Sequence, residues 1–191
     1  MFTTLLAYIM IGFYFLIDGY ARQGHQAKSL DRGQYDRGST FLLSVAFFVS
    51  VMALLAAPFL NHLNVGYLTH WVGAAWIGIV IMGISLLMRL WANMALGALY
   101  TRTLRVVEGH HIVHEGPYSV IRHPGYLGVI LMWIGGSLAV MNWIAVLAVL
   151  VSMSTAYHYR INAEETMLAM TQGKEYDSYR AHTWRLIPFI Y

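Results

Sequence analysis

The sequence contains no cysteine and little charge, and both absences limit what the protein can be. Without cysteine there are no disulfides, thiolate nucleophiles or cysteine-ligated metals. Only 11% of the 191 residues are charged, whereas 58% are hydrophobic and the mean hydropathy is +0.55. So few charges cannot cover a soluble globule of this size. A net charge of +3 without a lysine-rich tract also argues against a nucleic-acid partner. The composition therefore predicts a protein embedded in lipid.

The apolar residues form long runs that predict membrane helices. Lipid cannot satisfy backbone N–H and C=O groups, so membrane spans are helices or closed barrels, and continuous rather than alternating runs favour helices. Residues 1–17, 41–60 and 71–97 each suit one crossing, and residues 124–159 contain no Asp, Glu, Lys or Arg. That last stretch suits a helical hairpin that turns near Met141. We therefore predict an all-α, polytopic integral membrane protein with about five transmembrane helices, the last two forming a hairpin.

The basic residues indicate an orientation for this single membrane domain, residues 1–191. Five crossings put all twelve Lys and Arg on one side, counting Arg89 near the end of its span, where we expect it to snorkel toward the interface. The positive-inside rule then predicts an N-terminus outside and a cytoplasmic C-terminus. Residues 1–97 hold three transmembrane helices, and residues 98–191 hold the polar segments that can carry chemistry. The loops expected on the charged side are residues 18–40, 98–123 and 158–191, and those expected on the other side are residues 61–70 and 141–142.

A histidine-rich segment precedes the predicted hairpin. His110, His111 and His114 have a spacing that suits metal ligation on a helix. However, Gly116-Pro117 just after them favours a loop, and no carboxylate completes a recognisable ligand set. We therefore predict no metal site. Histidines that only hydrogen-bond the backbone at the membrane interface are the simpler alternative.

Two polar groups flank the hairpin. Pro124 suits the first turn of a helix, while Arg122 and His123 next to lipid must find partners, and the helix start offers free backbone N–H donors to an anion. Anchoring alone, with Arg122 on a lipid phosphate, is the alternative. If the last helix continues past the membrane, Arg160 and Glu164 share one face at i and i+4. An ordinary exposed ion pair is the simpler explanation for these two.

Together these residues resemble the isoprenylcysteine carboxyl methyltransferase family, part of a wider group that includes membrane phospholipid methyltransferases. The resemblance runs from about His110 to Pro188. It rests on Gly116-Pro117-Tyr118, Arg122-His123-Pro124-Gly125-Tyr126-Leu127-Gly128, Glu164-Glu165, Gly173-Lys174-Glu175-Tyr176 and Arg185-Leu186-Ile187-Pro188.

The resemblance implies an S-adenosylmethionine-dependent methyltransferase in the membrane. The acceptor it implies is the carboxylate of an isoprenylcysteine-like, lipophilic molecule, which with membrane lipids would be the partner. It implies two catalytic residues, Arg160 facing the acceptor and Glu164 contacting the cofactor. The implied cofactor-binding residues are His110, His111, Ile112, Val113, Tyr118, Arg122, His123, Pro124, Gly125, Tyr126 and Glu164.

Three other functions compete with this one. An NADPH-dependent, sterol-type membrane reductase has a similar Arg-His-Pro region, and Arg102, Arg105 and Arg122 would suit its 2′-phosphate. A phospholipid N-methyltransferase would need a base, such as Glu164 or Glu165, to deprotonate its amine acceptor. A transporter would place ionisable groups at mid-membrane, and the predicted spans have none there.

Overall fold

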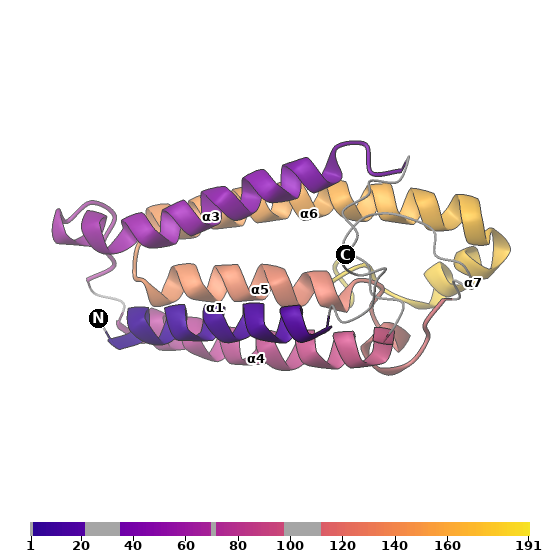
Figure 1. The fold of residues 1–191 in the computed structure, drawn as a ribbon, viewed down its shortest axis with the longest axis horizontal. Helices are drawn as coiled ribbons and strands as arrows, with labels where there is room; N and C mark the ends of the chain where they lie inside the picture. Colours follow the sequence, from indigo (N-terminus) through magenta and orange to yellow (C-terminus); the bar gives the residue numbers. More distant parts are fainter. Residues whose placement is uncertain (1, 22–34, 70–71, 98–111) are drawn as a thin grey trace.

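The computed structural model describes residues 2–21, 35–69, 72–97 and 112–191, and these are largely helical (Figure 1). The elements in chain order are α1 (Phe2–Ala21), α3 (Ser39–His62), α4 (Val72–Leu96), the 3₁₀ helix η2 (Gly116–Ser119), α5 (Pro124–Ala139), α6 (Trp143–Gln172) and α7 (Lys174–His182).

The helices agree with the predicted membrane spans except in the last pair. α1, α3, α4 and α6 are long and apolar enough to cross a membrane. α5 has 16 residues and extends about 24 Å, so it is shorter than a usual span. α6 continues to Gln172, well beyond residue 159, because residues 143–172 contain neither glycine nor proline. The all-α membrane fold with a terminal hairpin is confirmed.

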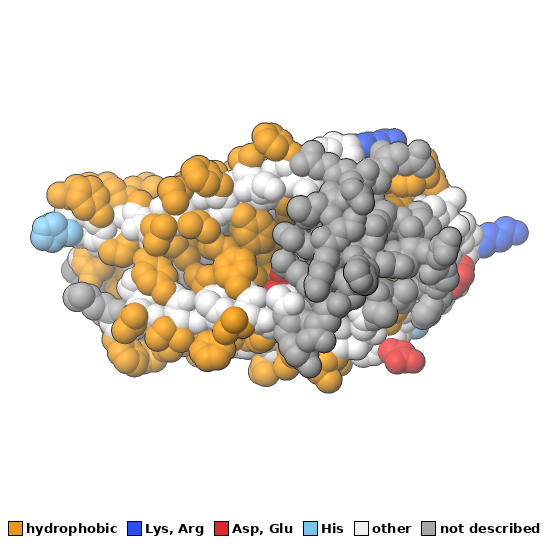
Figure 2. Space-filling model, viewed as in Figure 1, with side chains coloured by type: hydrophobic (Ala, Val, Ile, Leu, Met, Phe, Trp, Pro, Cys, Tyr) orange, Lys and Arg blue, Asp and Glu red, His pale blue; other side chains and the backbone are white. Residues whose placement is uncertain are grey.

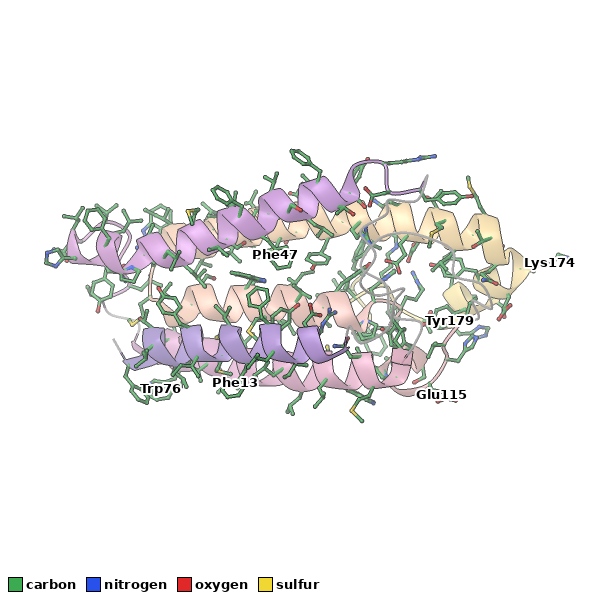
Figure 3. All side chains as sticks on the ribbon, in the orientation of Figure 1. Phe13, Phe47, Trp76, Glu115, Lys174 and Tyr179 are labelled. Carbon is green, nitrogen blue, oxygen red and sulfur yellow. The ribbon has the colours of Figure 1, made fainter. Side chains whose placement is uncertain are left out.

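The long helices form two layers (Figure 1). α3 packs along α6 in one layer, while α1, α4 and α5 form the other. α4 and α5 approach very closely, because a Cβ atom added to Gly78 would lie 2.5 Å from the Gly135 carbonyl oxygen. Such small residues let helices pack tightly where water supplies no driving force. Between the layers the ring of Phe47 from α3 meets the buried Trp133 of α5 edge-on, with centroids 5.5 Å apart (Figure 3).

The hairpin turn is fastened to the end of α3. Asn142 caps α6 by accepting hydrogen bonds from the backbone N–H groups of Ile144 and Ala145, at 3.0 and 3.1 Å. Its side-chain amide also donates to Asn61 Oδ1 and to the Val65 carbonyl, at 2.8 and 2.9 Å. These contacts place the two turns that the sequence assigns to the uncharged side at the same end of the molecule.

The opposite end, which carries α7, is the polar one. Figure 2 shows hydrophobic side chains along the bundle of long helices, called the shaft below, and exposed Lys, Arg, Asp and Glu side chains toward the α7 end. Phe13 and Trp76 point outward from the shaft and are about half exposed, as suits contact with lipid (Figure 3). Lys174, at the start of α7, lies at the polar end. Any reactive site built from charged side chains must therefore lie there.

Candidate active site

An aromatic group marks the candidate site at the start of α5. The rings of His123 and Tyr126 stack with centroids 5.4 Å apart and planes only 3° from parallel. Tyr126 also meets the ring of Tyr157 from α6, at 5.1 Å. His123 and Tyr157 are buried, and Tyr126 is half-buried, so the three rings form a continuous wall between α5 and α6. Pro124 begins α5 here, as predicted, and places His123 and Tyr126 on the same side.

Arg160 and Glu164 meet at the hydroxyl of Tyr126. That hydroxyl donates a short hydrogen bond to Glu164 Oε2 and accepts one from Arg160 Nε, at 3.3 Å. His123 Nδ1 lies 4.0 Å from the same Glu164 oxygen. The predicted i and i+4 pair therefore shares one site with the aromatic wall, and Tyr126 links its two members. An exposed surface ion pair does not describe it, because Arg160 is only 2% exposed.

Glu165 has a different environment from its neighbour Glu164. Its carboxylate accepts hydrogen bonds from Arg122 Nε at 2.9 Å and from Arg185 Nη2 at 2.6 Å, and it lies 3.4 Å from His123 Nε2. The Glu165 side chain is 5% exposed, whereas that of Glu164 is 24% exposed. Glu165 therefore joins the last segment of the chain to the start of α5, and Glu164 is the carboxylate that a ligand can reach.

Arg122 also joins the last segment of the chain to the start of α5. Besides Glu165, its guanidinium donates to the carbonyl oxygens of Arg180 and Thr183. Its backbone N–H donates to the Trp184 carbonyl at 2.7 Å, and that of His123 donates to the Arg185 carbonyl at 3.1 Å. The backbone donors that the sequence offers to an anion just before α5 are thus occupied by residues 184–185.

Close packing of α5 against α4 explains the two glycines of the predicted motif, Gly125 and Gly128. A Cβ atom on Gly125 would lie 2.9 Å from Arg89 Nη1, the same atom that donates to the Gly125 carbonyl at 3.1 Å. Three residues later, the Gly128 carbonyl accepts a 2.6 Å hydrogen bond from Ser85 Oγ. The prediction that Arg89 snorkels to the interface is wrong. Arg89 is 5% exposed and pairs with the buried carboxylate of Asp18 at 2.5 Å, because α1 and α5 cover this end of α4.

Asp36 is a residue of the site that sequence reasoning missed. Arg160 Nη1 donates to Asp36 Oδ1 at 3.1 Å and to Ser39 Oγ at 2.9 Å, and it lies 3.3 Å from Thr40 Oγ1. Burial opposes ionisation of Asp36, but hydrogen bonds from Thr40 and Ser39 and the charge of Arg160 lower its pKa below the usual value. The only local signal for Asp36 in the sequence is the run of polar residues at the start of α3, and such a run is also typical of an ordinary helix N-terminus.

A second cluster lies between residues 112–118 and α7. Ile112 packs against the buried rings of Tyr176 and Tyr179, and Val113 is half-buried beside it. The Tyr179 hydroxyl donates to the Tyr118 carbonyl at 2.7 Å, and burial raises the pKa of Tyr179 to about 12. Figure 3 places Tyr179 on the inner side of α7. The predicted residues His110 and His111 lie outside the described residues.

Tyr176 carries an unexplained polar atom. Its side chain is 1% exposed, and its hydroxyl has no hydrogen-bond partner among the described residues. A buried hydroxyl without a partner is unfavourable by about 1–3 kcal/mol, so such a group needs an explanation. Glu165 and Arg122 are close enough to affect its ionisation, so this hydroxyl lies beside the junction described above.

The described residues hold no group of three or more His, Asp or Glu side chains arranged to bind a metal ion. The carboxylates of the site face arginines and a tyrosine instead. Its chemistry is therefore that of a paired cation and anion beside aromatic rings, sheltered from water.

Comparison with known proteins agrees with this description. Residues 76–170 match the model of the isoprenylcysteine carboxyl methyltransferase (ICMT) family. A probable protein-S-isoprenylcysteine O-methyltransferase from Oryza sativa subsp. indica is 27% identical over 173 residues, covering 80% of this chain and 90% of the relative. Protein-S-isoprenylcysteine O-methyltransferase B from Arabidopsis thaliana is 28% identical over 65% of this chain and 64% of the relative. The chain belongs to the ICMT family.

A solved structure extends the agreement to the fold. The structure of the eukaryotic intramembrane Ras methyltransferase ICMT superposes with a TM-score of 0.63 and 25% identity. The match covers 78% of this chain and 52% of that one, so the present chain spans about half the length of that protein. Membership in the ICMT family makes this chain a membrane methyltransferase, which confirms the predicted enzyme class. No comparison favours the reductase or the phospholipid N-methyltransferase.

The region matched by the ICMT family model covers most of the candidate site. It contains Arg89, the segment 122–126, Arg160 and Glu164. It excludes Asp36 and the last residues of the chain, although both contact matched residues directly. The family-model match begins in α4, before the predicted start of the resemblance at His110, and ends at residue 170, before its predicted end at Pro188.

Proposed function

We propose that this protein uses S-adenosylmethionine to methylate the carboxylate of an isoprenylcysteine-like, lipophilic acceptor. The observation that carries the proposal is the junction at Tyr126, where one hydroxyl joins a buried arginine to a partly exposed carboxylate. The arginine suits an anionic acceptor and the carboxylate suits a cationic methyl donor.

The residues of the site fit the cofactor. S-adenosylmethionine, when bound, supplies a methyl group made electrophilic by a positively charged sulfur. Glu164 and the faces of Tyr126 and His123 suit the positive charges, since anions and aromatic rings both attract cations. Tyr176 offers a hydroxyl that has no partner in the part of the chain that the structure describes, and the apolar surface of Ile112 lies beside it for a planar ring. The further predicted contacts are His110, His111, Val113, Tyr118, Arg122, Pro124 and Gly125.

Two of these contacts take a different form from the one predicted. The Arg122 guanidinium holds Glu165, so we propose that it shapes the cofactor site by fixing residues 184–185 against the start of α5. Gly125 faces Arg89, so we propose that it contributes by letting α5 sit close to α4. Both roles position His123 and Tyr126 instead of contacting the cofactor themselves.

Arg160 is the residue proposed to hold the acceptor. A carboxylate is already ionised at neutral pH, so its methylation needs no general base, and alignment and exclusion of water carry the catalysis. The guanidinium fixes the acceptor anion while Tyr126 keeps Glu164 a fixed distance away. The apolar shaft described above suits the lipophilic part of the acceptor, which can approach sideways through the membrane.

A reductase would need several arginines for a nucleotide 2′-phosphate. Of the three candidates, Arg102 and Arg105 lie outside the described residues, and Arg122 is paired with Glu165. An amine methyltransferase would need a base, and Glu164, hydrogen-bonded to Tyr126, is the accessible carboxylate for that role. The product separates these chemistries, because a methyl ester releases methanol in base and an N-methyl group does not.

Binding and product analysis test the proposal. Calorimetry of the purified protein should give saturable binding of S-adenosylhomocysteine and none of NADPH; the opposite result would end the proposal. Membranes given a labelled methyl donor and an S-prenylated N-acetylcysteine should form a base-labile product. A base-stable methylated lipid in its place would identify an amine acceptor.

We also propose that the polar end faces the cytoplasm, with the N-terminus outside. The chain has no cysteine, so Asn64→Cys introduces a single reactive thiol at the opposite end. An impermeant maleimide should label this variant in intact cells. Labelling only after lysis would reverse the orientation.

A further inference from the structure

The turn before α3 covers Arg160 from the side opposite Tyr126. Asp36 Oδ1 accepts hydrogen bonds from Ser39 Oγ at 3.0 Å and from Arg160 Nη1 at 3.1 Å, and Asp36 Oδ2 accepts from the Thr40 backbone N–H at 3.4 Å. The side chains of Asp36 and Arg160 are each 3% exposed. Asp36 therefore accepts a backbone hydrogen bond from the first turn of α3, whose N-cap residue is Gly38, and serves as the buried counter-ion of the arginine.

The turn is itself held in a restricted backbone conformation. Arg37 and Gly38 follow one another with φ angles of 43° and 84°, both in the left-handed region. The Arg37 carbonyl accepts a 2.8 Å hydrogen bond from the hydroxyl of Tyr159, the residue before Arg160 in α6. Two adjacent residues of α6 thus hold the same turn, and the contact from Tyr159 does not depend on the charge of Asp36.

The electrostatic consequence concerns the acceptor. A buried arginine that already has a carboxylate partner at 3.1 Å attracts a second anion less strongly than an unpaired arginine would. The same partner removes the freedom of the guanidinium, because Asp36, Ser39 and Tyr126 occupy its donors from two sides. Asp36 therefore weakens the binding of the acceptor and improves its alignment.

We propose that Asp36 is a positioning residue for Arg160, which fixes the guanidinium for turnover and weakens its hold on an anionic acceptor. This inference rests on the proposed function, in which Arg160 orients the acceptor carboxylate. It assigns the turn at residues 35–38 to the acceptor half of the site, although that turn lies outside the region matched by the family model.

The Asp36→Asn variant separates the two effects. The amide keeps the shape of the side chain and an oxygen acceptor but removes the charge. We expect kcat to fall about tenfold, because the guanidinium is less firmly placed, and KM for a lipophilic carboxylate to fall about threefold. The affinity for S-adenosylhomocysteine, which involves the Glu164 side of the site, should stay within about twofold of the wild type.

Three further variants keep the inference testable. Asp36→Glu restores the charge and should raise both parameters back toward the wild-type values. Tyr159→Phe removes the tether to Arg37 and keeps the charge, so kcat should fall about twofold with KM unchanged. It serves as the second test if Asp36→Asn does not fold. Asp177→Asn, at an exposed position on α7, is the matched control and should change nothing.

The outcomes distinguish this inference from the proposed function. An Asp36→Asn enzyme with a lower kcat and a KM that is unchanged or higher would reduce Asp36 to a hydrogen-bond partner of the first turn of α3 and overturn the inference. Wild-type kinetics in Asp36→Asn, or a Tyr159→Phe enzyme with undiminished kcat, would also overturn it. A wild-type enzyme that methylates no lipophilic carboxylate while binding S-adenosylhomocysteine would instead refute the proposed acceptor.

Discussion

Glu164 and Glu165 are neighbours on α6, and exchanging each for glutamine should have opposite consequences. Glu165 is the buried partner of Arg122 and Arg185, so Glu165→Gln should destabilise the fold. Glu164 is partly exposed and contacts Tyr126, so Glu164→Gln should abolish most turnover and leave the fold intact. The two substitutions are chemically identical, which makes each the control for the other.

The magnitudes follow from burial. Removing one member of a buried ion pair leaves an uncompensated charge and destabilises by about 3–5 kcal/mol. Arg185 is 28% exposed and partly hydrated, so we expect the lower limit, about 3 kcal/mol, for Glu165→Gln. That corresponds to a fall in melting temperature of roughly 6 °C or more. For Glu164→Gln we expect less than about 0.5 kcal/mol of destabilisation and a loss of about 100-fold in kcat.

Thermal unfolding in detergent and methyl transfer should be measured on the same preparations. Glu175→Gln, at an exposed position on α7, should match the wild type in both assays. Equal melting temperatures for Glu165→Gln and the wild type would refute the structural role of Glu165. A several-degree loss in Glu164→Gln would refute the assignment of the accessible carboxylate.

Three further predictions concern other parts of the site. Gly125→Ala should destabilise by about 2 kcal/mol, since its Cβ would displace the Arg89 guanidinium, whereas Gly12→Ala, with nothing within 4 Å of its Cβ, should be neutral in the same melting assay. Tyr176→Phe removes a buried hydroxyl that has no partner among the described residues, so it should be about 1–3 kcal/mol more stable than the wild type in the melting assay yet bind S-adenosylhomocysteine about tenfold more weakly by calorimetry; unchanged binding would leave that hydroxyl outside the cofactor site. The pKa of Asp36 is lowered in the folded state, so its contribution to stability is present above the unfolded pKa of about 4 and is lost as the pH falls through the folded pKa. Melting curves recorded between pH 7 and about pH 3 should therefore converge for the wild type and Asp36→Asn at the acid end, and parallel curves would contradict this sign.

The membrane helices were predictable because lipid imposes a local requirement. Each span must satisfy its own backbone hydrogen bonds, so an uncharged run of sufficient length is enough to identify it. The hairpin was predictable for the same reason, and the turn near Met141 was placed correctly because Asn142 caps the following helix. The hairpin was predicted to end at residue 159 because charged residues begin at Arg160, and continuation of its second helix past the membrane was only a condition of the Arg160 and Glu164 prediction.

The site was predictable only where the chain brings residues together locally. Arg160 and Glu164 are one helical turn apart, and the resemblance supplied the residues at the start of α5. Asp36 lies 124 positions from Arg160, and only the packing of α3 along α6 brings it there.

Long-range packing also decides which of Glu164 and Glu165 is accessible to a ligand. A rotation of about 100° separates them on the helix, and the sequence does not state which face meets the last segment of the chain. The burial of Arg89 against Asp18 was likewise decided by packing, because α1 covers a position that hydropathy alone assigns to the interface.

The junction between residues 184–185 and the start of α5 sets an order for biosynthesis. Every helix that crosses the membrane is made before Trp184 and Arg185 emerge from the ribosome. Until then the Glu165 carboxylate lacks its contact with Arg185, and the backbone N–H groups of Arg122 and His123 are not yet held by residues 184–185. Insertion into the bilayer therefore precedes completion of the site, and a nascent chain held at the end of α6 is a finished membrane protein but an unfinished enzyme.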